Sequence, residues 1–286
     1  MAVPATILWV LVMWALPAAA ISVAAQAADA RPELVLTVVP RQPPAVTHVQ
    51  WMPFSKRLGD DIGARIMLRV FDSIIDFERS FQAGEPDLVY LNPYHAVIAR
   101  RAQGYIPLAR AGAGGLSGAL VVARDGPIHT LQDLQDKTIA FPHPNAFGAS
   151  LYMRALLTER HRIRFTANYV TSHGNVYRHV LRGLAAAGGG VNVTLRQEPP
   201  AVQEGLRVLY ETPPVAPHPL SVHPRVPAAL RAAIARAVLA MADDEPGRGM
   251  LAAVNLHDPV AADYARDYRD LERLQLEKYY VPTAAP

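Results

Sequence analysis

Short strand-like apolar runs alternate with helical segments from residue 31 onward, and this alternation limits the fold more than any other feature. Each apolar run is followed by a segment with helical periodicity. The strands are expected at 34–39, 65–70 and 87–91, and the helices at 53–62, 73–83 and 93–103. This order predicts an α/β fold in which a mostly parallel sheet is covered on both faces. In such folds, ligands bind at the carboxyl ends of the strands.

The rest of the chain continues this pattern and contains two segments rich in glycine or proline. Further strands are expected at 107–111, 118–124, 138–141, 168–172 and 206–210, and further helices at 130–136, 176–186, 227–242 and 263–278. The glycine-rich run 112–118 lacks the spacing and the Lys-Ser/Thr pair of a phosphate-binding loop. We interpret it as a crossing or turn. The proline-rich run 212–219 is a second candidate for a crossing between domains.

Residues 1–27 have the pattern of a secretory signal peptide. A short apolar run at 7–16 is followed by Pro17 and an alanine-rich stretch, and Ala25-Gln26-Ala27 fits a small-x-small cleavage site. An uncleaved membrane anchor is the alternative, because the apolar stretch 7–25 approaches spanning length and no Lys or Arg precedes it. We expect export and cleavage near Ala27.

The composition excludes several chemistries. The chain of 286 residues has no cysteine, which removes thiol catalysis, thiolate metal sites and disulfides. A formal net charge of +3 without a block of Lys or Arg argues against nucleic-acid binding. His173 and His179 are six residues apart and face different sides of a helix, so no metal site is expected. No cofactor is expected either.

The stretch that follows the strand at 138–141 is a candidate anion site. It passes through a turn rich in proline and asparagine and continues as a helix to about Arg160. Asn145 is a candidate N-cap. The N–H groups of Ala146, Phe147 and Gly148 would then be free, with the positive end of the helix dipole behind them.

Three other helices are also expected to start directly after strands, near Pro53, Pro93 and His173. In a doubly wound arrangement these starts face a common cleft. The candidate ligand-binding residues at the four starts are Gln50, Trp51, Tyr94, Asn145, Ala146, Phe147, Gly148, Ser172 and His173, with Asn92 beside them. Together they predict a pocket for a small oxyanion. Tyr94 and Phe147 have an alternative role in core packing, and His173 an alternative as a helix-start residue bonded to backbone.

Several short motifs occur in an order that resembles a known family. They are Pro53-Phe54, Asp87-Leu-Val-Tyr-Leu-Asn-Pro-Tyr94, Ile128-x-x-Leu-x-Asp-Leu134, Ile139-Ala-Phe141, Ser172-His173 and Asp267-Tyr268. The family is the phosphate/phosphite/phosphonate-binding proteins of ABC importers, the PhnD-like group of periplasmic binding proteins. The resemblance covers nearly all of the chain after residue 27.

The resemblance implies a two-lobed, type II-like periplasmic binding protein fold. Two doubly wound mixed sheets would be joined by two crossing strands, with lobe 1 formed by 28–117 and 213–286 and lobe 2 by 118–212. It also implies ligand contacts from Tyr94 and His173, and an anion-binding helix start at 146–148.

The chain departs from the family pattern at two places. Ala146-Phe-Gly-Ala149 replaces a Ser-Thr-Ser-Gly turn, so that only backbone donors remain there. The run 185–190, Ala-Ala-Ala-Gly-Gly-Gly, replaces a segment that carries an acidic residue in the family. Because carboxylates bind the amine of aminophosphonates, an amine-bearing ligand is less expected here.

The resemblance therefore implies capture of a small oxyanion without chemistry. The protein would act in the periplasm as a monomer and deliver a phosphonate-, phosphite- or phosphate-like ligand to the membrane permease of an ABC importer. A membrane sensor kinase is an alternative partner. An enzyme on the same fold is the rival from another class, although no nucleophile elbow or Ser-His-carboxylate spacing occurs in the sequence.

Overall fold

The computed structural model describes residues 31–112 and 114–281. The predicted signal peptide, 1–27, lies outside the described residues. The first of two sheets combines segments from both ends of the described chain, in the order β11-β4-β10-β3-β1-β2. Its strands are β1 (Glu33–Val38), β2 (Arg65–Arg69), β3 (Leu88–Tyr90), β4 (Ile106–Ala111), β10 (Pro219–Val222) and β11 (Pro259–Ala261).

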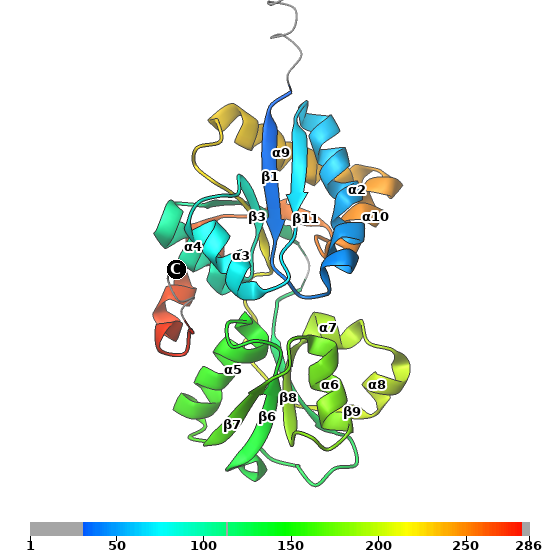
Figure 1. Ribbon diagram of the computed structural model, residues 1–286, viewed down its shortest axis with the longest axis vertical. Helices are drawn as coiled ribbons and strands as arrows, with labels where there is room; N and C mark the ends of the chain where they lie inside the picture. The colour runs from blue at the N-terminus through cyan, green and yellow to red at the C-terminus, as the bar shows by residue number, and fades with distance from the viewer. Residues whose placement is uncertain (1–30, 113, 282–286) are drawn as a thin grey trace, which may run out of the picture. The chain divides into compact units, whose positions relative to one another are not determined.

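Parallel pairing in this sheet brings the carboxyl ends of the strands β1, β2 and β3 to the same edge. β1 pairs in parallel with β2 and β3, and Leu36 lies opposite Leu68 and Leu88. β10 is antiparallel to β3 and β4, which makes the sheet mixed. Five main helices flank the strands: α2 (Pro44–Ile62), α3 (Ile74–Gln82), α4 (Pro93–Gln103), α9 (Ala228–Ala240) and α10 (Glu245–Ala253). α2 packs against α9 and α10, whereas α3 packs against α4, and Figure 1 shows the two groups on opposite sides of β1 and β3.

The second sheet is formed by one continuous stretch of chain, in the order β7-β6-β8-β5-β9. Its strands are β5 (Gly118–Ala123), β6 (Lys137–Phe141), β7 (Phe165–Tyr169), β8 (Ala187–Val191) and β9 (Leu206–Glu211). β6 is parallel to β7 and β8, and β5 is antiparallel to β8 and β9. A helical segment follows β6 and consists of α5 (Tyr152–Ala155) between the π-helical turns η2 (Phe147–Leu151) and η3 (Leu156–Arg160). The helices α6 (His173–Leu181), α7 (Asn192–Arg196) and α8 (Pro200–Glu204) complete this part.

Two segments cross between the sheets and pair with each other. The backbone of Leu116 and that of Val215 exchange two hydrogen bonds of 2.9 and 3.0 Å in an antiparallel bridge. The prediction of two mixed sheets in a two-lobed α/β fold is therefore confirmed. The exact lobe boundaries, 117/118 and 212/213, stay predictions.

Helix α2 begins earlier than predicted, at Pro44 instead of Pro53. Both prolines satisfy the first-turn rule. The decisive pattern is the spacing of Thr47, Trp51, Phe54 and Leu58, which are buried along one face. Pro53 is tolerated inside the helix because it lies on the exposed side.

The C-terminal segment 263–278 is not the single amphipathic helix that we predicted. It forms α11 (Tyr264–Asp267) and two short 3-10 turns, η5 (Arg269–Leu274) and η6 (Leu276–Lys278). Tyr268 is fully buried and donates its hydroxyl to the Pro217 carbonyl at 2.7 Å, which anchors the chain at the crossing segment. Gln275 then has a φ of 49°, in the left-handed region, which interrupts helical geometry.

Several other strands and helices also differ from those predicted. The glycine-rich run 188–190 lies within strand β8, which the sequence did not indicate, and β10, β11 and α10 were also not predicted. α6 starts at His173 and not at 176, and it ends before Gly183, whose φ is 68°. No helix among the described residues is long and apolar enough to span a bilayer.

We predict that Gly189→Ala lowers the free energy of unfolding by about 1–3 kcal/mol, because overpacking forces backbone to move. A Cβ at Gly189 would overlap the carbonyl oxygen of Ala149 and the ring of Phe141. Urea denaturation of the two proteins measures the change. Gly249→Ala is the control: this helical glycine has open space around its Cβ position, so we expect a gain of about 0.4–1 kcal/mol. Equal stability of Gly189→Ala and the wild type would contradict the close approach of η2 to β8.

Candidate functional site

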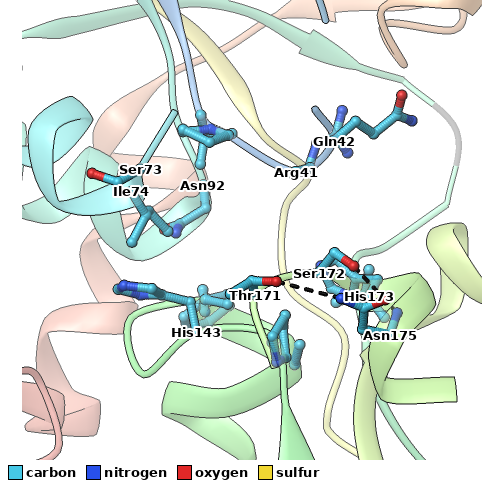
Figure 2. Close-up of a pocket in the computed structure, with 18 of the residues that line it drawn as sticks. Arg41, Gln42, Ser73, Ile74, Asn92, His143, Thr171, Ser172, His173 and Asn175 are labelled. Carbon is cyan, nitrogen blue, oxygen red and sulfur yellow. Dashed lines mark hydrogen bonds between the residues drawn. The ribbon is translucent and has the colours of Figure 1, made fainter. Parts of the chain in front are cut away.

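A cleft of about 540 Å³ lies where loops from the first sheet face loops from the second. It is lined by residues that follow β1, β2 and β3 on one side and β6 and β7 on the other, together with residues of the crossing segments. Figure 2 shows Arg41, Ser73 and Asn92 on the first side, opposite His143 and Ser172. Of the four helix starts predicted to meet at one cleft, those near Pro93, Ala146 and His173 contribute lining residues, whereas Pro53 does not.

Arg41 supplies a positive charge to the cleft. It follows β1 directly, and its guanidinium carbon lies 5.8 Å from the centre of the Tyr90 ring. Among the described residues, no carboxylate or other acceptor forms a hydrogen bond or ion pair with this side chain. A guanidinium offers a planar fork of N–H donors that matches carboxylate and phosphonate-type oxygens. Asp72, which is exposed, is the only carboxylate among the described lining residues.

Two histidines near Arg41 are held in the neutral form. Burial lowers the pKa of His173 to about 3, and the charge of Arg41 acts in the same direction. Burial also lowers the pKa of His218 well below its ordinary value, and its ring stacks on Tyr90 at 5.5 Å. The Nδ1 atom of His173 lies 3.3 Å from the Thr194 hydroxyl. At neutral pH these rings add donors and acceptors to the cleft without adding charge.

His143 is the third neutral histidine of the cleft. Its Nδ1 accepts a hydrogen bond of 3.2 Å from the Asn145 N–H. Burial lowers its pKa to about 4, an effect that the nearby Glu78 carboxylate partly offsets. The accepted bond also requires an unprotonated Nδ1. His143 was not identified from the sequence.

The hydroxyl groups of the cleft are used in local backbone bonds. Ser73 and Ser172 are the N-caps of α3 and α6, and each Oγ accepts an N–H from the residue three positions later. Thr171 donates to the Val170 carbonyl at 2.7 Å. The Ser172 hydroxyl proton has no acceptor among the described residues, so it is able to donate to a ligand.

The predicted anion turn lines the cleft, but its details differ from expectation. Ala146, Phe147 and Gly148 are all lining residues. The N–H of Ala146 is already used, because it donates to the His143 carbonyl at 3.2 Å. The N–H groups of Phe147 and Gly148 have no acceptor within the described part of the chain. The segment begins as a π-helical turn in which Leu151 donates to the Ala146 carbonyl.

Asn145 is not the N-cap of this segment. The capping position is Ala146, and no side chain caps it. The Asn145 side chain is buried and donates to Glu78 at 2.9 Å and to the Val281 carbonyl at 2.8 Å. These partners turn it away from the cleft, which it does not line.

Tyr94 and Phe147 pack together. The Phe147 ring lies nearly parallel to Tyr94 at 6.3 Å and to Tyr152 at 5.6 Å. Tyr94 is 1% exposed and does not line the cleft. Phe147 is 3% exposed. The burial of both rings agrees with the alternative role in core packing. Tyr94 and Tyr152 both stack on Phe147.

Gln50 and Trp51 lie inside α2 and not in a loop at its start, because the helix begins at Pro44. Neither residue lines the cleft. Trp51 is 3% exposed and packs on Tyr90 at 4.8 Å. Trp51 therefore supports the Tyr90 ring, beside which Arg41 lies. Arg41 and Gln42 line the cleft in the place predicted for Gln50 and Trp51.

The rule that found Ser172 and His173 could also have found Arg41. Both positions follow a parallel strand at its carboxyl end. Arg41 lies between β1 and Pro44, the true start of α2, and therefore well before the start predicted at Pro53. Asp72 and Ser73 follow β2 in the same way. No group of three or more His, Cys, Asp or Glu side chains suited to a metal ion occurs in the described residues.

Comparison with known proteins identifies the family. The model of the periplasmic substrate-binding protein of phosphonate ABC transporters matches residues 36–268, most of the chain. The chain belongs to this family. Its members are substrate-binding transport proteins that act outside the cytoplasm, and the resemblance found in the sequence is confirmed. No match was found among curated proteins.

Solved structures share the fold at low sequence identity. PhnD1 from Prochlorococcus marinus, in complex with methylphosphonate, has a TM-score of 0.77 and 16% identity, covering 87% of this chain and 99% of that one. A Xanthomonas citri protein bound to chloride has a TM-score of 0.75 and 20% identity over 86% and 98%. A binding protein component of an ABC phosphonate transporter from Pseudomonas aeruginosa has a TM-score of 0.75 and 14% identity over 86% of each chain.

We predict that His143 makes the protein less stable as the pH falls. Its pKa is about 4 in the folded protein and near 6.5 when unfolded. Between these values the unfolded chain binds a proton that the folded chain does not, so the free energy of unfolding falls as pH is lowered, by at most about 1.4 kcal/mol per pH unit. His143→Asn keeps an acceptor and removes the titration. Urea denaturation at pH 7 and 5 should show a smaller loss for this variant, and equal losses would contradict the assignment.

Proposed function

We propose that this protein captures a small phosphonate-, phosphite- or phosphate-like oxyanion in the cleft and delivers it to the permease of an ABC importer. The observation that carries the proposal is the Arg41 guanidinium, which lines the cleft without a carboxylate partner among the described residues. A cationic fork in a partly apolar pocket favours an oxyanion. The family to which the chain belongs supports the chemical class.

In this proposal, Arg41 compensates for the missing hydroxyl donors of the 146–149 turn. The N–H groups of Phe147 and Gly148 and the Ser172 hydroxyl supply uncharged donors from the second lobe. His173, also from the second lobe, supplies a neutral ring. The ligand therefore binds between Arg41 on one lobe and donors on the other, and it stabilises the arrangement in which both lobes contact it.

The local use of the cleft hydroxyls favours binding over catalysis. Ser73 and Thr171 donate their protons to an Asp76 carboxylate and a backbone carbonyl, respectively. Neither is paired with a histidine as a nucleophile would be. We therefore propose that the chain has no enzymatic activity of its own.

We further propose that the protein works in the periplasm as a monomer after cleavage near Ala27. Its membrane partner is the importer permease, which would bind the closed form. A sensor kinase is the alternative partner. Both would recognise the same ligand-bound form, and co-purification with the membrane proteins of the native host distinguishes them.

A ligand screen tests the proposed cargo. Isothermal titration of the mature protein, freed of bound ligand by unfolding and refolding, is carried out with phosphate, phosphite, methylphosphonate, 2-aminoethylphosphonate and sulfate. We expect binding of one or more phosphorus oxyanions and no binding of sulfate. Absence of binding by every phosphorus compound would contradict the proposal.

We predict that Arg41→Ala weakens binding of the best ligand by roughly 10–150-fold, the equivalent of losing a charged hydrogen bond worth about 1.5–3 kcal/mol. Arg41→Lys retains the charge and loses the planar fork, so its loss should be smaller. Arg65→Ala is the control, because Arg65 is exposed on β2 and pairs with Glu33 at 2.9 Å. An unchanged dissociation constant in Arg41→Ala would remove Arg41 from the site.

A further inference from the structure

Asn145 connects the anion turn to two distant parts of the chain. It directly precedes Ala146. Both N–H groups of its side-chain amide donate hydrogen bonds, and its amide oxygen accepts one. The amide nitrogen donates to Glu78 Oε2 at 2.9 Å and to the Val281 carbonyl at 2.8 Å, and the amide oxygen accepts from the Val281 N–H at 2.9 Å. Glu78 belongs to α3 beside the first sheet, whereas Asn145 follows β6 of the second sheet. These bonds therefore run between the lobes.

Glu78 is a fully buried carboxylate that depends on these partners. Its exposed fraction is 0%. Besides Asn145, it accepts a hydrogen bond of 2.9 Å from the Tyr280 hydroxyl and lies 2.8 Å from Nε2 of His95. A buried carboxylate is costly unless its oxygens are hydrogen-bonded. Separation of the lobes would remove the Asn145 bond and leave the Tyr280 hydroxyl as the remaining partner of Glu78 Oε2.

The C-terminal strap, residues 276–281, also contacts the second lobe directly. Arg154 of α5 donates to the Tyr279 carbonyl at 2.8 Å and to the Pro144 carbonyl at 2.9 Å. Glu159 binds both Lys278 and the Tyr279 hydroxyl at 2.6 Å. Figure 1 shows the end of the described chain, in red, next to α4 and α5. The strap thus contacts the lobes away from the paired crossing segments.

From these contacts we infer that Glu78 and the C-terminal strap are positioning elements of the ligand site. They hold Asn145, and through it the turn 146–148, in its place in the lining of the cleft that Arg41 also lines. They also limit how far the lobes separate before a ligand binds. The part of this inference that concerns affinity rests on the proposed function, whereas the part that concerns lobe separation does not.

Two changes to the strap test the inference. The first is a chain that ends after Tyr279, with a chain that ends after Val281 as its matched control. The second is Tyr280→Phe, which removes one hydroxyl and keeps the ring, in case the shortened chain does not fold. Tyr264→Phe is the control for the second change, because Tyr264 donates to Glu272 at 2.5 Å within the C-terminal part of the first lobe.

Lobe separation is measured first, without ligand. Because the chain has no cysteine, Lys56→Cys on α2 and Thr166→Cys on β7 give two exposed positions for spin labels. We expect a longer and broader distance distribution by double electron-electron resonance in Tyr280→Phe and in the chain that ends after Tyr279. We expect no change in Tyr264→Phe or in the chain that ends after Val281. Identical distributions in all proteins would overturn the inference.

Affinity for methylphosphonate is then measured by isothermal titration, or for phosphate if methylphosphonate does not bind. We expect Tyr280→Phe to raise the dissociation constant roughly tenfold, because the ligand must then also order the turn that the strap no longer holds in place. A changed distance with unchanged affinity would overturn the positioning of the turn. If the wild type binds neither anion, the proposed function fails, and the distance measurement still decides whether the strap restrains the lobes.

Discussion

The candidate site depends on a close backbone contact between the anion turn and the second sheet. The carbonyl of Gly148 lies where a Cβ of Gly118 would be, and the carbonyl of Ala149 lies where a Cβ of Gly189 would be. Only glycine leaves this space. The contact fixes the height of the turn above β5 and β8. The ring of Phe147, stacked between Tyr94 and Tyr152, holds the turn from its other side.

The charge distribution of the cleft follows from a single arginine among uncharged donors. Burial keeps His143, His173 and His218 neutral, so Arg41 alone among the described lining residues supplies positive charge. The one lining carboxylate, Asp72, is exposed and does not pair with Arg41, so the guanidinium donors are not occupied by a carboxylate of the described residues. The same burial explains the predicted loss of stability at low pH.

The fold could be predicted from the sequence to a large extent because its signals are local. The helix expected from 93 does begin at Pro93, because the side chain of the preceding Asn92 accepts the His95 N–H in the first turn. The predicted elements were wrong where the local sequence rules allow two structures or indicate none. Pro44 and Pro53 both satisfy the same rule, and only the burial of Trp51 and Phe54 along one face distinguishes them. The glycine-rich run 188–190 is a strand because its backbone pairs with β5 and β6, and its glycines leave room for Phe141 and Tyr177, which no local pattern reveals.

The site was harder to predict because it depends on contacts that are distant in sequence. Asn145 has the chemistry of an N-cap, yet it bonds to Glu78 and Val281, which lie 67 and 136 positions away. Arg41 could not be predicted as a cleft residue while the start of α2 was placed at Pro53 instead of Pro44. Ser172 and His173, by contrast, do line the cleft, although strand β7 ends at Tyr169 and not at 172 as predicted.

The most direct test is a crystal structure of the mature chain with methylphosphonate. We predict phosphonate oxygens within hydrogen-bond distance of the Arg41 guanidinium and of the N–H of Phe147 or Gly148, so that both lobes contact one anion. A ligand bound in the cleft with Arg41 turned away, or bound outside the cleft, would contradict it.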